Sequence, residues 1–140
     1  MAKKLELIDD QMCFGCGKKN SRGLQLDFEL DKEKRRLKTR WRPVKEHQGY
    51  ANLVHGGMIG LVLDEMMVNL LWALKNPAVS AQFSVRLRRP AIVGEPLDCE
   101  AWITEESGPI FRTEAEARNA RGEVVALATA KCLVISEEDE

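Results

Sequence analysis

The chain has 140 residues, of which 44% are hydrophobic and 31% are charged, and its formal net charge at pH 7 is −1. This length fits one domain, because two halves would each bury too small a core. The nearly balanced charge argues against a general nucleic-acid partner, which usually requires a basic excess.

The sequence also argues against export and against a membrane span. The apolar stretch within residues 1–10 is too short for a signal peptide and is interrupted by acids. The longest apolar run, 58–74, contains Asp64, Glu65 and Asn69. Each carboxylate near a bilayer centre would cost about 2.5 kcal/mol or more. We therefore expect a buried helix in a soluble, cytoplasmic protein with no membrane partner.

The first half of the chain alternates between turns and strands. Residues 11–23 are rich in turn formers. Apolar residues then alternate with polar ones over 24–30 and again over 34–42, which predicts two half-buried strands. The short charged turn at 31–33 joins them as a hairpin. A loop over 43–54 follows.

The second half predicts one helix and four more strands. The helix, at about 57–74, is apolar on nearly every face, which is typical of a helix wrapped by other structure. Asn76-Pro77 closes it. We expect an α+β fold in which an antiparallel sheet of about six strands wraps around one long helix. Residues 1–140 form a single domain, with a core at about 13–135 and a frayed acidic tail at 136–140. The four later strands are expected at 79–89, 97–105, 110–118 and 123–135.

Two glycines precede the predicted helix, in the string His55-Gly56-Gly57. Without side chains they allow a ligand to approach backbone N–H groups that have no partner within the helix. Those groups and the helix dipole favour developing negative charge, as an oxyanion hole requires. The alternative is that the glycines only permit a tight turn and close packing.

Asp64 is the candidate catalytic carboxylate. It lies in the middle of the predicted helix among apolar neighbours, where an unpaired charge is costly. Such surroundings raise a carboxyl pKa toward values useful for a base or nucleophile. The alternative is a carboxylate that faces solvent or pairs with an arginine. Gly57 and Asp64 lie seven residues apart, or about 10 Å along the axis. If both act on one carbonyl, the two must come from different chains of a dimer.

These motifs resemble those of the phenylacetate-pathway (PaaI-like) type of hotdog-fold acyl-CoA thioesterase. The resemblance covers about 13–134 and is specific for the fold, but it does not identify the acyl group. It is carried by Cys13-x-x-Cys16-Gly17, Asn20, Gly23-Leu24, His47-Gln48-Gly49-Tyr50, His55-Gly56-Gly57 with Asp64 seven positions later, Leu63-Asp64-Glu65, Arg86-x-x-Arg89-Pro90 and Gly94-Glu95.

The resemblance implies a role for each site residue. Asp64 would be the general base or nucleophile, and the Gly57 N–H, with that of Gly56, would polarise the thioester carbonyl from the partner chain. His55 would shape this loop and hydrogen-bond near the carbonyl, and Ser80 would help to orient the attacking water. The partners implied are acyl-CoA and further copies of the chain, as a homodimer that pairs into a homotetramer. No cofactor is implied, because coenzyme A is part of the substrate.

The chain departs from the family pattern at Gly49, where some relatives have an asparagine. Gln48 or Asn52 would then take over its role beside the carbonyl or the water. Basic residues near the end of the strand at 79–89 meet the coenzyme A phosphates in the family, and Arg suits phosphate geometry. The alternative for these residues is a solvated strand face. They are Arg86, Arg88 and Arg89.

Glu65 points about 100° away from Asp64 around the helix and is the fallback carboxylate, assigned to substrate binding. Cys13-x-x-Cys16 would suit the start of a zinc site, but structural zinc takes four ligands, and Cys99 and Cys132 lie singly within strands. We therefore expect no metal, free thiols, and a cysteine turn that packs over one end of the helix. Two other functions stay open: a non-catalytic acyl-CoA-binding module and a hotdog hydratase or dehydratase acting on enoyl thioesters.

Overall fold

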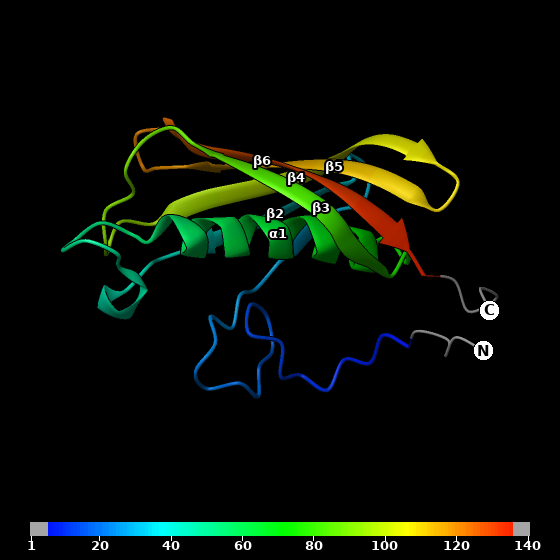
Figure 1. Ribbon diagram of the computed structural model, residues 1–140, viewed down its shortest axis with the longest axis horizontal. Coiled ribbons are helices and arrows are strands. Elements are labelled where there is room, and N and C mark those ends of the chain that lie inside the picture. Colours follow the sequence, from blue (N-terminus) through cyan, green and yellow to red (C-terminus); the bar gives the residue numbers. More distant parts are fainter. Residues whose placement is uncertain (1–5, 136–140) are drawn as a thin grey trace.

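The computed structural model describes residues 6–135 and contains one long helix against one sheet (Figure 1). The predicted acidic tail at 136–140 lies outside the described residues. The elements follow the chain as β1 (Glu29–Asp31), β2 (Arg36–Trp41), the 3-10 helix η1 (Lys45–His47), α1 (Gly56–Ala73), β3 (Ala78–Leu87), β4 (Leu97–Ser107), β5 (Ile110–Arg118) and β6 (Val124–Val134).

All six strands belong to a single antiparallel sheet in the order β1-β2-β4-β5-β6-β3. The hairpin of β1 and β2 is present as predicted. The strands at the two ends of this order differ greatly in length. β1 has three residues, whereas β3 has ten. The predicted α+β hotdog architecture is therefore confirmed, with β3 as its long free edge.

The helix α1 begins and ends within one residue of the predicted bounds. It is long and apolar enough to cross a membrane by length and composition. Its core residues, however, are packed against the sheet, as the sequence predicted for a buried helix. The N-terminal segment covers its other side (Figure 1). The buried helix residues are Ile59, Gly60, Val62, Leu63, Met66, Met67, Leu70 and Leu71.

The predicted strand at 24–30 is largely wrong, because only Glu29–Asp31 is a strand. Gln25 has a φ of 51°, in the left-handed region that a strand does not use. The amides of Leu24 and Leu26 donate instead to the carbonyls of Phe14 and Gly15, at 2.8 and 2.9 Å. The alternating apolar residues thus fasten the N-terminal segment and do not extend the sheet.

A β-bulge interrupts β3 near its start. Ser80 pairs with Cys132 and Gln82 with Lys131, so Ala81 has no partner in the ladder. Beyond the bulge, Val85 and Leu87 face α1, since methyl groups added at Gly60 and Gly56 would meet them at 3.4 and 2.6 Å. A regular strand would turn Ser80 to the opposite face, because side chains alternate. The bulge turns it toward α1 instead.

Candidate active site

The N-terminal end of α1 carries the predicted amide donors, but one of them is already engaged. His55 is the N-cap residue, and its Nδ1 accepts a hydrogen bond from the Gly57 N–H at 2.9 Å. The Gly56 N–H donates to none of the described residues. His55 therefore does more than shape the loop, since it occupies the donor assigned to the substrate carbonyl. This cap was not foreseen, because sequence alone does not define a side-chain rotamer.

A cavity of about 460 Å³ lies beside this end of the helix. The exposed His55 and the half-buried Gly56 line it, so a ligand can reach the first residue of the helix from solvent. Pro90, which follows β3, also lines it. The complete lining is Gly49, Tyr50, Leu53, Val54, His55, Gly56 and Pro90.

Asp64 lies two turns further along α1 and is half-buried. Its Oδ1 is buried and has no hydrogen-bond partner within the described part of the chain. Burial raises the pKa of Asp64 above its ordinary value, and the charge of Glu65 adds to this, whereas the Ser80 hydroxyl opposes it. A desolvated carboxylate with a free oxygen is what a general base or nucleophile requires. The alternatives of a solvated or arginine-paired carboxylate do not fit these surroundings.

Ser80 and Cys132 face Asp64 from two neighbouring strands. They are register partners on β3 and β6. Burial raises the pKa of the Cys132 thiol, and the negative charge of Asp64 raises it further. Ser80 was predicted from the family pattern, but Cys132 was missed. Only the strand register shows that position 132 lies opposite position 80.

Asp64 and the helix N-terminus do not meet within one chain. The helix is continuous over Gly56–Ala73, so Gly57 and Asp64 are about 10 Å apart along its axis. The C=O double bond of a thioester carbonyl is only about 1.2 Å long. One carbonyl therefore cannot contact both groups of the same helix.

In the loop before the helix, the side chain of Gln48 forms a hydrogen bond within the loop itself. The Oε1 of Gln48 accepts a hydrogen bond from the Asn52 backbone N–H at 3.0 Å, and Asn52 has a φ of 66°. Gln48 is thus committed to the loop, and Asn52 is exposed. Position 49 is adjacent to His55, since a Cβ on Gly49 would lie 3.6 Å from the His55 Cα. A Cβ at position 49 would therefore make only ordinary van der Waals contacts with His55.

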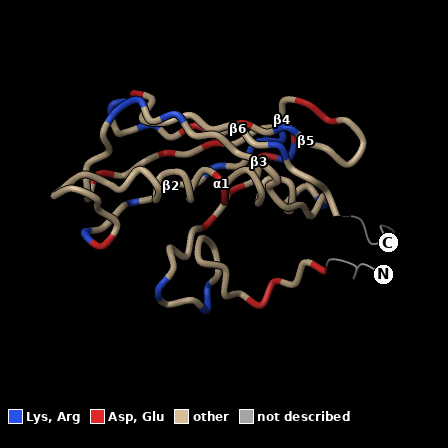
Figure 2. Tube along the Cα trace, in the orientation of Figure 1, with Lys and Arg blue, Asp and Glu red and all other residues tan. Residues whose placement is uncertain are grey.

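The three arginines of the predicted phosphate site divide between two places. Arg86 lies in a hollow with Trp102, whose ring is covered by the Arg36 guanidinium at 4.4 Å. This is the sheet face away from α1. Arg88 and Arg89 follow β3 at the end of the sheet where Figure 2 shows basic residues gathered. Arg89 forms an exposed ion pair with Glu123 at 3.4 Å.

Glu65 is directed away from the Asp64 surroundings and toward the N-terminal segment. The Cys13 thiol donates to its Oε1 at 3.2 Å, and the Asn69 side-chain amide donates to its Oε2 at 3.0 Å. The structure therefore gives no support to Glu65 as a fallback for Asp64. The cysteine turn also covers the middle of α1, not one end as expected, because its partners are Glu65 and Asn69.

Several solved structures share this fold. The Escherichia coli PaaI protein, from the phenylacetic acid degradation operon, is 18% identical with a TM-score of 0.74, over 81% of each chain. A phenylacetic acid degradation-related protein from Ralstonia eutropha JMP134 is 24% identical with a TM-score of 0.73, over 79% of this chain and 86% of that one. A protein from Streptococcus mutans UA159, bound to acetyl CoA, is 18% identical with a TM-score of 0.74, over 81% and 91%. At these identities the likeness shows the fold alone.

Comparison with curated proteins gives no match. The family model of the thioesterase superfamily, however, matches residues 51–126, more than half of the sequence. That segment contains the helix N-terminus, Asp64 and Ser80. With the six-stranded sheet curled over a single long helix, this match shows that the chain belongs to the thioesterase superfamily.

Proposed function

We propose that the protein is an acyl-CoA thioesterase, which hydrolyses the thioester to a free acid and coenzyme A. The observation that carries this proposal is the half-buried Asp64, which has Ser80 beside it and one buried oxygen without a hydrogen bond to any of residues 6–135. A helix whose first amides line an open cavity supplies the complementary half of the site. The S. mutans structure with acetyl CoA supports the substrate class.

In the proposed reaction, Asp64 acts as a general base or as a nucleophile. As a base it accepts a proton from water while the water oxygen bonds to the carbonyl carbon. The carbon–sulfur bond then breaks, and the coenzyme A thiolate leaves and takes up a proton. Ser80 orients the water. The reaction requires no separate cofactor, because a carboxylate and an oxyanion site supply its chemistry.

The carbonyl is polarised by the Gly56 and Gly57 amides of a partner chain. The thioester oxygen displaces the His55 ring from the Gly57 N–H, while the Gly56 N–H is already available. This exchange replaces a neutral hydrogen bond with one to developing negative charge. Bonds of the second kind are about twice as strong, so the exchange favours the transition state.

The long edge of β3 is the proposed dimer interface. Its ten residues end one side of the sheet, and the exposed fractions of Phe83 and Leu87 are 46% and 53%. A long apolar edge is normally paired or covered. Antiparallel pairing of two β3 strands would extend the sheet and bring the partner's helix toward Asp64. Two such dimers would form the homotetramer, acting in the cytoplasm.

Release of free coenzyme A thiol tests this function directly. Short, long and aromatic acyl-CoAs are supplied to the purified protein, and we expect turnover of at least one class. Binding of the whole panel without cleavage would favour a non-catalytic acyl-CoA-binding module. Hydration of an enoyl-CoA, with the thioester intact, would favour the hydratase or dehydratase class.

Arg88→Ala and Arg89→Ala are expected to raise KM for acyl-CoA about tenfold each, with kcat little changed. Each substitution removes a charged hydrogen bond to phosphate, and such bonds contribute roughly 1.5–3 kcal/mol. Arg86→Ala is the matched control, because Arg86 belongs to the same segment but lies on the sheet face away from α1. An equal KM increase in all three variants would contradict this division and indicate a general effect of positive charge.

A further inference from the structure

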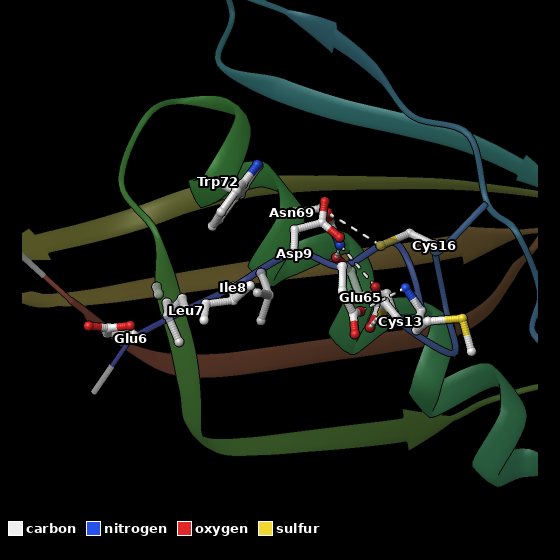
Figure 3. Close-up of a pocket in the computed structure, with 13 residues that line it drawn as sticks. Glu6, Leu7, Ile8, Asp9, Cys13, Cys16, Glu65, Asn69 and Trp72 are labelled. Carbon is white, nitrogen blue, oxygen red and sulfur yellow. Dashed lines mark hydrogen bonds between the residues drawn. The ribbon is translucent and has the colours of Figure 1, made fainter. Parts of the chain in front are cut away.

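We propose that Cys13, Cys16 and Glu65 bind a thiophilic divalent cation of the zinc class, with a fourth coordination position that faces a cavity. The two thiols come from the N-terminal turn and the carboxylate from the middle of α1 (Figure 3). The sequence favoured no metal, because it shows only two of the four ligands that structural zinc takes. The structure adds Glu65, which lies 49 residues after Cys16 in the chain.

The spacing of the donor atoms suits one ion. One ligand atom from each of the three residues lies within 4.8 Å of the others. The Cys13 Sγ and the Glu65 Oε1 are 3.2 Å apart. Zinc binds sulfur at about 2.3 Å and carboxylate oxygen at about 2.0 Å, so the sulfur–oxygen edge of a tetrahedral site is about 3.5 Å. Small side-chain rotations would complete the site.

The turn that carries the cysteines is built for close approach to the helix. The Gly17 N–H donates to the Cys13 carbonyl at 2.8 Å, which closes the Cys-x-x-Cys turn. A Cβ on Gly17 would lie 2.4 Å from the Gln11 carbonyl oxygen, and one on Gly15 would lie 2.3 Å from the Glu65 Cγ. Position 17 therefore requires glycine, and a side chain at position 15 would displace the Glu65 side chain. The turn holds the thiols against Glu65 with the two-residue spacing that zinc sites use.

Asn69 supports the carboxylate from behind. Its side-chain amide donates to the Glu65 Oε2 at 3.0 Å and to the Glu65 backbone carbonyl at 2.8 Å. Such contacts orient ligands in metal sites and raise their affinity. They leave Oε1, the oxygen nearest Cys13, directed toward the thiols. The Asn69 Oδ1 lies 3.8 Å from the Cys16 Sγ.

The cluster can take up a divalent cation without a change in its net charge. Glu65 is half-buried, and no lysine or arginine forms an ion pair with it in residues 6–135. A divalent ion that displaced both thiol protons would balance the two thiolates, so the net charge would stay at that of Glu65. A cavity of about 590 Å³ opens beside the cluster (Figure 3). An ion would enter through this cavity, and a water molecule from it would take the fourth coordination position. Cys13, Cys16, Glu65 and Asn69 all line it.

This site is separate from the one proposed for thioester hydrolysis. Asp64 faces Ser80 and Cys132 on the sheet, whereas Glu65 faces the N-terminal segment on the other side of α1. An ion here would tie that segment to the middle of the helix. Its consequence is therefore metal-dependent stability, which can be measured without any substrate.

The test uses full-length protein kept reduced with a phosphine, first freed of metal and then titrated with Zn²⁺ alone and, separately, with Co²⁺. We expect one equivalent of Zn²⁺ per chain, a rise in Tm, and a thiolate-to-cobalt charge-transfer band in the near ultraviolet. Cys13→Ser or Cys16→Ser should weaken Zn²⁺ binding by more than about 100-fold, and Glu65→Gln by about 10-fold.

Cys99→Ala is the matched control, because Cys99 is a buried thiol within β4, away from the turn. It should bind Zn²⁺ and give the cobalt band like the wild type. If reduced wild-type protein shows neither the cobalt band nor a zinc-dependent Tm, the proposal is wrong. Zinc binding of undiminished affinity in the Cys13→Ser and Cys16→Ser variants would also overturn it. The wild-type cobalt spectrum decides the matter even if a variant does not fold.

Discussion

The Asp64→Asn variant is expected to lose about 10²- to 10⁴-fold in kcat for acyl-CoA hydrolysis while its Tm rises. The amide is nearly the same size as the carboxylate but cannot accept a proton or attack a carbonyl. The Tm should rise because burial disfavours the ionised Asp64 in the folded protein. Coenzyme A release and thermal unfolding, measured on the same preparation, check both effects.

The pH dependence of the Tm difference between Asp64→Asn and the wild type shows whether the gain comes from the buried charge or from a general change in stability. The pKa of Asp64 is raised on folding, so its ionisation favours the unfolded chain. The penalty is absent below the unfolded-state pKa of about 3.9 and grows as pH rises through the higher folded-state value. The Tm gain of Asp64→Asn should therefore be small near pH 4 and larger near pH 8. Wild-type kcat/KM should rise with pH over the same range, since the base acts in its ionised form. A variant that keeps full activity would remove Asp64 from the mechanism.

Gly57→Pro should reduce kcat by about 10²- to 10³-fold, as removal of one oxyanion donor does. Proline removes the N–H, yet the first turn of a helix tolerates it. Gly57→Ala is the control, because it keeps the N–H and adds a Cβ 3.1 Å from the His55 Nδ1, a side-chain atom that can shift. Steady-state kinetics should place the alanine variant near wild type. Equal losses in both would indicate a steric effect and not a missing donor.

Mixing the Asp64→Asn and Gly57→Pro chains tests whether the site is shared. In a mixed dimer, one site combines an intact Asp64 from one chain with an intact Gly57 from the other. After random subunit exchange, the mixture of two inactive proteins should recover about a quarter of wild-type activity. A mixture that exchanges subunits yet stays inactive would show that each site is built within one chain.

The fold was predicted well where apolar residues alone determine the element. The helix was placed to within one residue, because its long apolar run is bounded by glycines and by Asn76-Pro77. In β2 the alternation was also sufficient, since Leu37, Thr39 and Trp41 are buried and the residues between them are not. The same alternation failed over 24–30. There, the backbone of Gln25 adopts the left-handed region. The neighbouring amides form hydrogen bonds with Phe14 and Gly15 in place of the hydrogen bonds of a strand.

The apolar surroundings of Asp64 were predictable from the sequence, but the geometry of the candidate site was not. Asp64 was marked by its apolar neighbours, and burial does raise its pKa. The His55 ring on the Gly57 amide and the placement of Cys132 depend on a rotamer and on a register, which no local pattern encodes. Arg86 is separated from Arg88 and Arg89 because its side chain lies on the sheet face away from α1. The sequence shows three basic residues in one segment but does not show which face of the sheet each one occupies.

The bulge in β3 changes which residues face α1 from even-numbered to odd-numbered positions. Before Ala81, even-numbered residues such as Ser80 face α1, and after it odd-numbered residues such as Val85 do. Deleting Ala81 would place Ser80 directly before Gln82, whose partners Cys132 and Lys131 are already consecutive on β6. Ser80 and Val85 would both still face α1, because the two halves of the strand would then share one regular alternation. Inserting or deleting a residue elsewhere in β3 would instead turn the side chains of one part of the strand to the other face. Position 81 is thus a place where this strand can lose a residue without turning any other side chain over.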